Sequence, residues 1–425
     1  MTIRRFLTPI CVLCLASPVV ALAQAYKTTF KFDLGPGKVA PGYYQVLPTT
    51  AYSKELGYGF EPGAEVNAVD RGGDDALRGD FIYSDKPFLF SVRVPEGNYR
   101  VTVTLGDAAG ESVTTVKAEL RRLMLEKVST GLGKFKTCTF VVNVRTPAIA
   151  GGGQVRLKDR EKTSEWGAWD DKLTLEFNDK RPCVCGIEIA KVNDLPTIFL
   201  LGDSTVCDQP KEPWNSWGQM LTRFLKPEVV VANHAESGES IRSSLGAGRF
   251  DKVYSLLKKG DYLFLQFGHN DMKDRDPNAM ATYKSNLKRI VAETRKRGAM
   301  PVLVTSMERK SGIERDTLAL YPQTVRDVAE EDNVALIDLH AASKVFYKAL
   351  GQDLDKAFQD GTHHNNYGSY ELAQSIIQGI KDNKLDLARS IVDDFKGFDP
   401  NRPDLVDQFQ MPATPGVPGE RPLGS

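Results

Sequence analysis

Nine residues, 197–205 with the sequence TIFLLGDST, constrain the fold of this chain more than any other stretch. A short apolar run of strand length ends abruptly at Gly-Asp-Ser-Thr. This is typical of a buried parallel strand that delivers a small polar loop to the carboxyl edge of its sheet. Ser204 in that loop is the candidate nucleophile. Because a serine hydroxyl is a weak nucleophile, it needs a base to remove its proton and usually a third group to orient that base.

The residues that follow alternate between apolar strands and helical stretches. Strands are expected at 197–201, 229–232, 262–267, 301–306 and 334–339, and helices at 214–225, 250–258, 277–297, 321–331, 341–350 and 367–381. Residues 385–395 could also be helical. This alternation predicts an α/β domain over residues 196–400, built on a mostly parallel, doubly wound sheet with its functional loops at the carboxyl ends of the strands.

The first part of the chain, residues 26–192, follows a different pattern. Apolar residues alternate over 88–94, a Pro-Glu-Gly-Asn turn follows at 95–98, and the alternation resumes over 99–105, which is typical of a β-hairpin. Further strand-like runs lie at 112–118, 120–125, 137–144, 154–157, 173–177 and 184–189. With almost no helical pattern between them, these runs predict an all-β sandwich or jelly roll.

Trp166 and Trp169 precede one of these strands and allow two interpretations. Indole faces pack well against sugar rings, so the pair could form a carbohydrate-binding platform. Tryptophans just before a strand more often pack in a core or at a domain interface, and we favour that interpretation.

Composition and the chain ends bear on location and partners. Lys plus Arg and Asp plus Glu both number 55, so no net charge marks a nucleic-acid or membrane partner. Residues 1–23 combine two arginines, an apolar run and a small-residue cleavage site, the pattern of a signal peptide, which predicts a periplasmic or extracellular protein. No later stretch is long and apolar enough to span a membrane. Residues 411–425 are rich in Pro and Gly and are expected to form a flexible tail.

Four cysteines follow the expected signal peptide: Cys138, Cys183, Cys185 and Cys207. Export permits disulfides, but their pairing cannot be read from the sequence. Cys183 and Cys185 would point to the same face of a strand, which suits buried small hydrophobic residues as well as bridges.

All five histidines lie after residue 196, so an imidazole base must come from the second domain. Asp360 precedes His363 by three residues in a loop before the last expected helix. At this spacing the carboxylate can accept from one ring nitrogen while the other faces Ser204. His363 is therefore the candidate base, and Asp360 is the acid that orients it.

The remaining histidines have simpler interpretations. His234 and His340 lie at strand ends, where packing or hydrogen bonding is the more frequent role. A metal site formed by Asp360, His363 and His364 is an alternative that we do not favour, because no further ligands are spaced to close it.

Acyl transfer also requires hydrogen-bond donors where negative charge develops on the carbonyl oxygen. Gly238, in the loop after the second expected strand, lets a backbone N–H approach a substrate closely. Asn270, in the loop after the third, carries a side-chain amide that can donate. With the Ser204 N–H, they would form an oxyanion hole from three successive strand ends.

Four blocks of the sequence together resemble those of the SGNH (GDSL-like) hydrolases. They are Gly-Asp-Ser-Thr at 202–205, Gly238, Gly-His-Asn-Asp at 268–271 and Asp-Gly-Thr-His at 360–363, in the order of that family. The Gly-Asp-Ser-Thr variant, with segments 217–220 and 304–309, further resembles rhamnogalacturonan acetylesterases of carbohydrate esterase family twelve. The resemblance covers about residues 196–381. Motifs at 32–35 and 57–60 look like the galactose-binding-like β-sandwich that precedes some bacterial members.

The resemblance implies a flavodoxin-like sheet and assigns a role to each candidate residue. Ser204 would be the nucleophile, His363 the general base and then acid, and Asp360 its orienting group. Ser204, Gly238 and Asn270 would form the oxyanion hole, and no metal or organic cofactor is required. The implied reaction removes acetyl groups through an acetyl-serine intermediate, and the implied partner is an acetylated plant cell-wall polysaccharide or oligosaccharide, most specifically rhamnogalacturonan.

The substrate leaves alternatives open. Arg242 and Arg309 follow expected active-site strands and could pair with uronate carboxylates, although such residues are more often solvated or in structural ion pairs. Glu239 departs from the small or basic residue that related esterases often carry after the glycine of the second block. Esterases acting on xylan, another acetylated glycan or short-chain lipids would keep the same machinery, and a non-catalytic carbohydrate-binding protein would carry it inertly.

Overall fold

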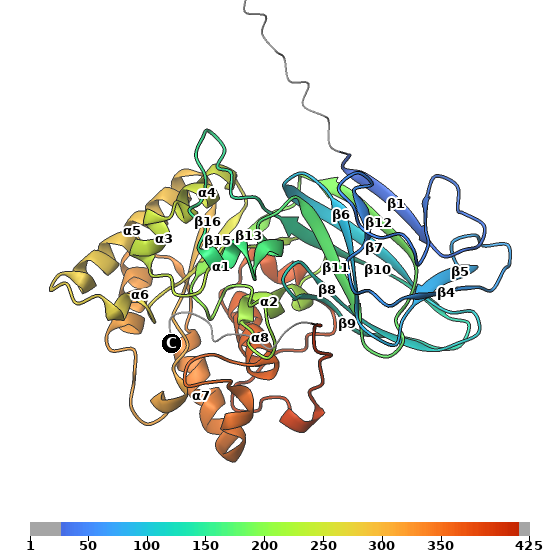
Figure 1. Ribbon diagram of the computed structural model, residues 1–425. Helices are drawn as coiled ribbons and strands as arrows, with labels where there is room; N and C mark the ends of the chain where they lie inside the picture. Colours follow the sequence, from blue (N-terminus) through green and yellow to red (C-terminus); the bar gives the residue numbers. More distant parts are fainter. Residues whose placement is uncertain (1–26, 416–425) are drawn as a thin grey trace, which may run out of the picture.

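The computed structural model of the chain describes residues 27–415, which form two adjoining regions (Figure 1). The signal peptide expected over residues 1–23 and residues 416–425 of the expected tail lie outside this range. Within it, none of the helices is both long and apolar enough to cross a bilayer.

The first region consists of two sheets. One contains seven strands, with the order β10-β7-β12-β1-β2 and with β5 paired to β12 and β4 to β5; the other has the order β3-β6-β11-β8-β9. The bounds are β1 Thr29–Leu34, β2 Tyr44–Val46, β3 Tyr58–Phe60, β4 Asn67–Asp70, β5 Asp80–Tyr83, β6 Phe88–Arg93, β7 Gly97–Gly106, β8 Ser112–Ala118, β9 Arg122–Thr130, β10 Phe135–Val144, β11 Lys172–Asn178 and β12 Cys183–Val192. All pairs are antiparallel except β1 with β2.

The two sheets enclose one apolar core. Phe32 and Val101 of the first sheet belong to the same buried cluster as Phe90 and Leu175 of the second. The rings of Phe32 and Phe90 meet edge to face with centroids 5.3 Å apart, a favoured aromatic geometry. The period-two pattern in the sequence therefore corresponds to a sandwich that buries one face of each sheet.

Two expected strands differ from the structure. Residues 154–157 form no strand, and Gln154 makes only an isolated bridge with Ala148. The strand expected at 120–125 begins at Arg122, because Glu119 and Arg121 take positive φ values of 54° and 63° in the turn before it. Strands β1 to β5 were not among the expected strands, and β2 to β5 contain only three or four residues each, too few for a clear alternation.

The second region contains a five-stranded parallel sheet with the order β14-β13-β15-β16-β17. The strands are β13 Thr197–Gly202, β14 Val230–Asn233, β15 Tyr262–Gln266, β16 Met300–Val304 and β17 Ala335–Ile337. Successive residues of β13 enter different apolar clusters: Ile198 and Leu200 join one, and Phe199 and Leu201 join the other. The sheet is therefore covered on both faces, as its continuous apolar strands require.

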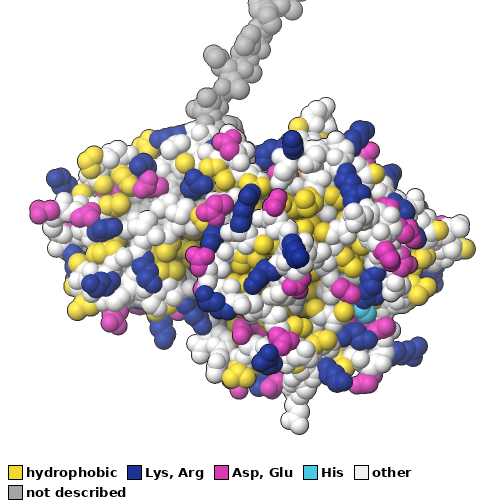
Figure 2. All heavy atoms as spheres, turned by 180° about the vertical axis from the view of Figure 1, so that it is seen from behind, with side chains coloured by type: hydrophobic (Ala, Val, Ile, Leu, Met, Phe, Trp, Pro, Cys, Tyr) yellow, Lys and Arg dark blue, Asp and Glu magenta, His cyan; other side chains and the backbone are white. Residues whose placement is uncertain are grey.

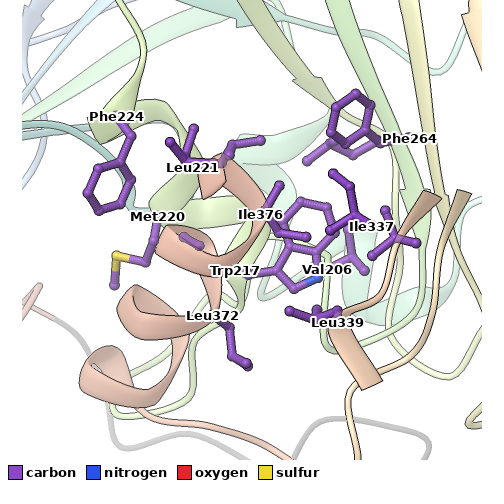
Figure 3. Packing of buried hydrophobic residues seen from close by; sticks show 14 of the residues in the cluster. Val206, Trp217, Met220, Leu221, Phe224, Phe264, Ile337, Leu339, Leu372 and Ile376 are labelled. Carbon is purple, nitrogen blue, oxygen red and sulfur yellow. The ribbon is translucent and has the colours of Figure 1, made fainter. Parts of the chain in front are cut away.

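The helices of the second region supply those covering layers. They are α2 Trp217–Met220, α3 Ile241–Gly246, α4 Arg249–Leu256, α5 Ala279–Lys296, α6 Tyr321–Glu331, α7 Leu339–Leu350 and α8 Asn366–Asp382. The first region contains one short α-helix, α1 Asp159–Lys162, among the described residues. Figure 3 shows Trp217 of α2 among Val206, Ile337 and Ile376, within the larger buried cluster. The helix expected at 214–225 is only this short α2 followed by a 3₁₀ turn at Leu221–Phe224, and residues 385–395 contain a 3₁₀ turn at Asp386–Ser390.

The two regions share a buried interface that contains charged residues. Both amino groups of the Arg249 guanidinium donate to Glu161, at 3.0 and 2.6 Å, and neither side chain is exposed. The Trp169 indole N–H also donates to Glu161, at 2.9 Å, and its ring meets His234 edge to face. Trp169 is buried, so the favoured interpretation of interface packing is confirmed for this residue.

The chain end also contacts the first region. The buried Lys117 ammonium donates to Pro412 O at 2.7 Å and to the Thr414 hydroxyl at 2.8 Å. The Thr414 hydroxyl in turn donates to Glu176 at 2.7 Å. Residues 412–414 thus differ from the expectation of a flexible tail, because they provide partners for a lysine that would otherwise be costly to bury.

The four cysteines of the described range are free thiols. Cys183 and Cys185 share a small buried cluster with Phe81, consistent with their expected position on one face of a strand. On the outer surface, Figure 2 shows basic and acidic side chains interspersed over the face seen from behind.

Candidate active site

Ser204, His363 and Asp360 lie together at the carboxyl edge of the parallel sheet. The Ser204 hydroxyl oxygen is 2.8 Å from His363 Nε2, and His363 Nδ1 is 2.8 Å from the Asp360 carboxylate. Ser204 follows β13, whereas the other two residues lie in the loop before α8. The structure thus brings together the three residues that the sequence selected, in the arrangement of a serine hydrolase triad.

The Asp360 carboxylate determines which ring nitrogen carries the proton. Burial opposes its ionisation, but hydrogen bonds from the His363 ring and from the backbone N–H groups of His363 and Thr362 keep the pKa of Asp360 below its ordinary value. An ionised carboxylate only accepts, so His363 Nδ1 must donate to it. In the neutral ring, His363 Nε2 then carries no proton and can accept the Ser204 hydroxyl proton.

The expected oxyanion donors come from the loops after β13, β14 and β15. Gly238 has φ of +76°, a left-handed conformation that side-chain-bearing residues rarely adopt. The side-chain nitrogen of Asn270 donates to Glu239 O at 3.0 Å, which links the second and third loops. Because an amide NH₂ has two hydrogens, this bond leaves one available for a substrate oxygen.

A chain of buried polar groups supports the nucleophile loop from behind. The Trp217 indole donates to Gln266 at 2.8 Å, Gln266 donates to the Thr205 hydroxyl at 2.7 Å, and that hydroxyl donates to Asp203 at 2.7 Å. The other Asp203 oxygen lies 3.3 Å from His269 Nδ1. A series of buried hydrogen bonds of this kind favours one conformation for the loop.

Two contacts around the site carried no sequence signal. The Gln209 side chain donates to Ser204 O at 2.6 Å, and Lys158, from the first region, contacts the loop that contains Gly238. Neither residue belongs to a motif. The Lys158 contact joins positions 79 apart in the chain, so only a structure or an alignment could have found it. The Gln209 contact spans five positions but follows no recognised pattern.

The other histidines have structural roles. His364 accepts from or donates to the Tyr347 hydroxyl at 2.9 Å, and burial lowers its pKa to about 3. His234 packs against Trp169 and Phe199 in the interior. His340 Nδ1 lies 3.2 Å from the Arg326 guanidinium, so its Nε2 donates to Glu308 at the same distance.

Glu308, His340 and Asp316 are the only group of three or more candidate metal ligands found among residues 27–415. The Glu308 carboxylate already accepts from the backbone N–H groups of Arg309 and Thr317 as well as from His340. Asp316 pairs with Lys344 at the surface. These hydrogen bonds and this ion pair favour a structural role for the three residues, and we assign no metal to them.

The two candidate substrate arginines have different surroundings. The Arg242 side chain is 74% exposed and pairs with Asp274 at 3.3 Å. Arg309 is half-buried, and its guanidinium donates to backbone oxygens of Thr317 and His269 at 3.3 and 3.4 Å. Arg242 therefore has a guanidinium face open to solvent, whereas Arg309 is committed to the loops around the site.

Comparisons with known proteins identify relatives of both regions. Residues 200–369 match the GDSL-like Lipase/Acylhydrolase family, and residues 30–136 match the galactose-binding domain-like family of β-agarase and YXIM-like esterases. Rhamnogalacturonan acetylesterase RhgT of Bacillus subtilis is 35% identical over 46% of this chain and 94% of its own length. The probable rhamnogalacturonan acetylesterase YesY of the same organism is 32% identical over 46% and 97%.

The uncharacterized esterase YxiM of Bacillus subtilis aligns with both regions, at 28% identity over 83% of this chain and 90% of its own length. RhgT and YesY, both above 30% identity, align with this chain over nearly their full length. The chain belongs to the family of GDSL-like, or SGNH, hydrolases that includes the rhamnogalacturonan acetylesterases.

Proposed function

We propose that this protein is a serine carbohydrate esterase that removes acetyl groups from rhamnogalacturonan. The observation that carries the proposal is the hydrogen-bonded series Ser204, His363 and Asp360, with 2.8 Å at each side-chain contact. Two relatives whose names describe established or probable rhamnogalacturonan acetylesterases support the choice of substrate.

The reaction begins when the Ser204 oxygen attacks the acetyl carbonyl carbon and its proton passes to His363 Nε2. The Ser204 and Gly238 N–H groups and the Asn270 amide would stabilise the negative oxygen of the tetrahedral intermediate. When the intermediate collapses, the bond to the sugar oxygen breaks and His363 returns the proton to that oxygen. Asp360 stabilises the imidazolium throughout.

The second half of the reaction repeats these steps with water. His363 Nε2 removes a proton from a water molecule, whose oxygen attacks the acetyl-serine carbonyl. Collapse of the second intermediate breaks the ester bond to Ser204, and the proton on His363 returns to the serine oxygen. Acetate leaves, and Ser204 and His363 return to their starting states.

The proposal also includes architecture and location. The strand order β14-β13-β15-β16-β17, with an apolar cluster on each face, favours the doubly wound flavodoxin-like sheet that the sequence predicted. Residues 1–23 would direct export to the periplasm or beyond. The amino-terminal sequence of the protein recovered outside the cytoplasm tests this, and a chain that retains Met1 there would contradict cleavage.

Acetate release from a panel of substrates tests the function. The panel contains acetylated rhamnogalacturonan, acetylated xylan, a short-chain lipid ester and a neutral aryl acetate, each assayed with the parent and with Ser204→Ala. We expect the highest kcat/KM on rhamnogalacturonan and none of this activity in the variant. A preference for xylan or lipid would contradict rhamnogalacturonan as the substrate. If no ester released acetate, the alternative of a non-catalytic carbohydrate-binding protein would be favoured.

A further inference from the structure

The loop that contains Gly238 is held by a lysine from the other region of the molecule. Lys158 lies in the connection between β10 and β11, immediately before α1. Its ammonium group donates to Ser237 O and pairs with the Glu239 carboxylate at 2.7 Å. Ser237 and Glu239 are the two neighbours of Gly238, so one side chain contacts the loop on both sides of the proposed oxyanion donor.

Lys158 is itself fixed in place. Its backbone N–H donates to the Glu161 carboxylate at 2.8 Å. That carboxylate also receives the bidentate pair from Arg249, at a site where neither side chain is exposed. A paired, fully buried carboxylate is costly to displace, so the backbone at Lys158, from which the side chain extends, is held in place.

Glu239 joins this contact to the remaining donor. Its carboxylate is only 2% exposed and also accepts from the Ser244 hydroxyl at 3.2 Å. Burial opposes its ionisation, but the Lys158 and Arg249 charges keep the pKa of Glu239 below its ordinary value. The Glu239 backbone oxygen accepts from Asn270. A movement of Glu239 would therefore displace Gly238 and the Asn270 amide together.

We propose that Lys158 is a positioning residue of the esterase, which holds Gly238 and Asn270 in the orientation of oxyanion donors. The first region would then be a working part of the hydrolase site, whether or not it also binds carbohydrate. This inference rests on the proposed function. It also accounts for Glu239, since an acid at this position is the partner that a lysine from the first region requires.

Steady-state kinetics of full-length Lys158→Met test the proposal, because Met keeps most of the length of the unbranched side chain and removes its charge and donors. Misplaced oxyanion donors affect the transition state more than the bound substrate. We therefore expect kcat on an aryl acetate to fall about tenfold to 10²-fold while KM changes little. Lys158→Arg, which restores the charge and donors, should recover most of the lost kcat.

Lys252→Met is the matched control. Lys252 crosses the same interface from α4, donating to Ala148 O and pairing with Glu96 at 2.6 Å. Within the described range 27–415, no hydrogen bond or ion pair joins its side chain to residues 236–240. A general loosening of the interface would lower the activity and thermal stability of both variants alike. Equal losses of kcat in Lys158→Met and Lys252→Met would therefore overturn the proposal.

A double variant distinguishes positioning from an independent effect. If Lys158 acts through the donors, Lys158→Met should cost much less kcat when Asn270→Ala is already present, because coupled residues are not additive. Multiplicative losses, or a parental kcat in folded Lys158→Met, would contradict the proposal. If that variant does not fold, Lys158→Gln replaces it with the same criteria. An inactive parent would instead refute the proposed function.

Discussion

The Ser204 hydroxyl oxygen lies 2.8 Å from His363 Nε2, although 159 positions separate the two residues in the chain. Ser204 follows a central strand of the parallel sheet, and His363 lies at the entrance to the last long helix. Parallel strands deliver their carboxyl-terminal loops to one edge, where the loop before α8 also ends. The topology of the parallel sheet therefore brings Ser204 and His363 together at this edge.

Ser204→Ala and His363→Ala should each remove nearly all turnover. The serine supplies the atom that bonds to the acyl group, and the histidine moves its proton, so either loss disables the unit. We expect kcat to fall by about 10⁶ in each variant and no further in the double variant. Acetate release measures this, with Ser255→Ala, on α4, as a control. Comparable activity in folded Ser204→Ala and parent would refute the triad.

Asp360→Asn should keep the protein folded but lower kcat by about 10⁴. Asparagine offers an N–H where the carboxylate accepted from His363 Nδ1, which favours the tautomer with its proton on Nε2. That nitrogen could then no longer accept the Ser204 proton. Kinetics at saturating aryl acetate check the loss. An unchanged kcat would show that Asp360 does not orient the base.

Asn270→Ala should lower kcat by about 10² to 10³, with a smaller change in KM. Only the transition state places full negative charge on the carbonyl oxygen, so removal of a donor penalises catalysis more than binding. Because Asn270 also donates to Glu239 O, thermal unfolding must accompany the kinetics. A loss confined to KM would contradict an oxyanion role.

The triad could be predicted from sequence because its residues occur in short blocks at strand ends. Each strand of the parallel sheet overlaps an expected strand, since a continuous apolar run bounded by small polar residues is a strong local signal. Asp360 and His363 are only three positions apart, which limited their possible geometry. Local patterns were therefore sufficient for the edge of the sheet and for the groups that meet there.

Other features depend on tertiary contacts that no local pattern records. The expected helix around Trp217 is a single α-helical turn followed by a 3₁₀ turn at Leu221–Phe224. Gly218 within it packs so closely that a Cβ would lie 2.1 Å from Val206 O. The unpredicted α3 begins at Ile241, the side chain of Ser240 caps it, and Asp271 from a distant loop accepts from the Ile241 N–H. Lys158 was missed because its partners lie about 80 residues further along.

Substitution of Arg242 and of Arg309 should distinguish a residue that recognises the substrate from one that supports the structure of the site. Arg242 is 74% exposed, so Arg242→Gln should lower kcat/KM for acetylated rhamnogalacturonan by about tenfold and hardly affect a neutral aryl acetate. Arg309 donates to backbone oxygens around the site, so Arg309→Gln should lower activity on both substrates. Equal effects of Arg242→Gln on the two substrates would argue against uronate recognition.

Glu371→Gln should make the stability of the protein less dependent on pH. Burial, with the nearby Asp404 charge, raises the pKa of Glu371 to about 8. The folded state therefore binds more protons than the unfolded chain between about pH 4.5 and 8, and the free energy of unfolding falls as the pH rises through this window. Glutamine imitates the neutral acid, so the variant should gain on the order of 2–4 kcal/mol relative to the parent between pH 5 and 9.

Thermal unfolding at pH 5 and pH 9 measures this change in relative stability, with Glu330→Gln, at an exposed position of α6, as the control. The same difference in Tm between Glu371→Gln and parent at pH 5 and pH 9 would show that the carboxyl group titrates normally in the folded protein.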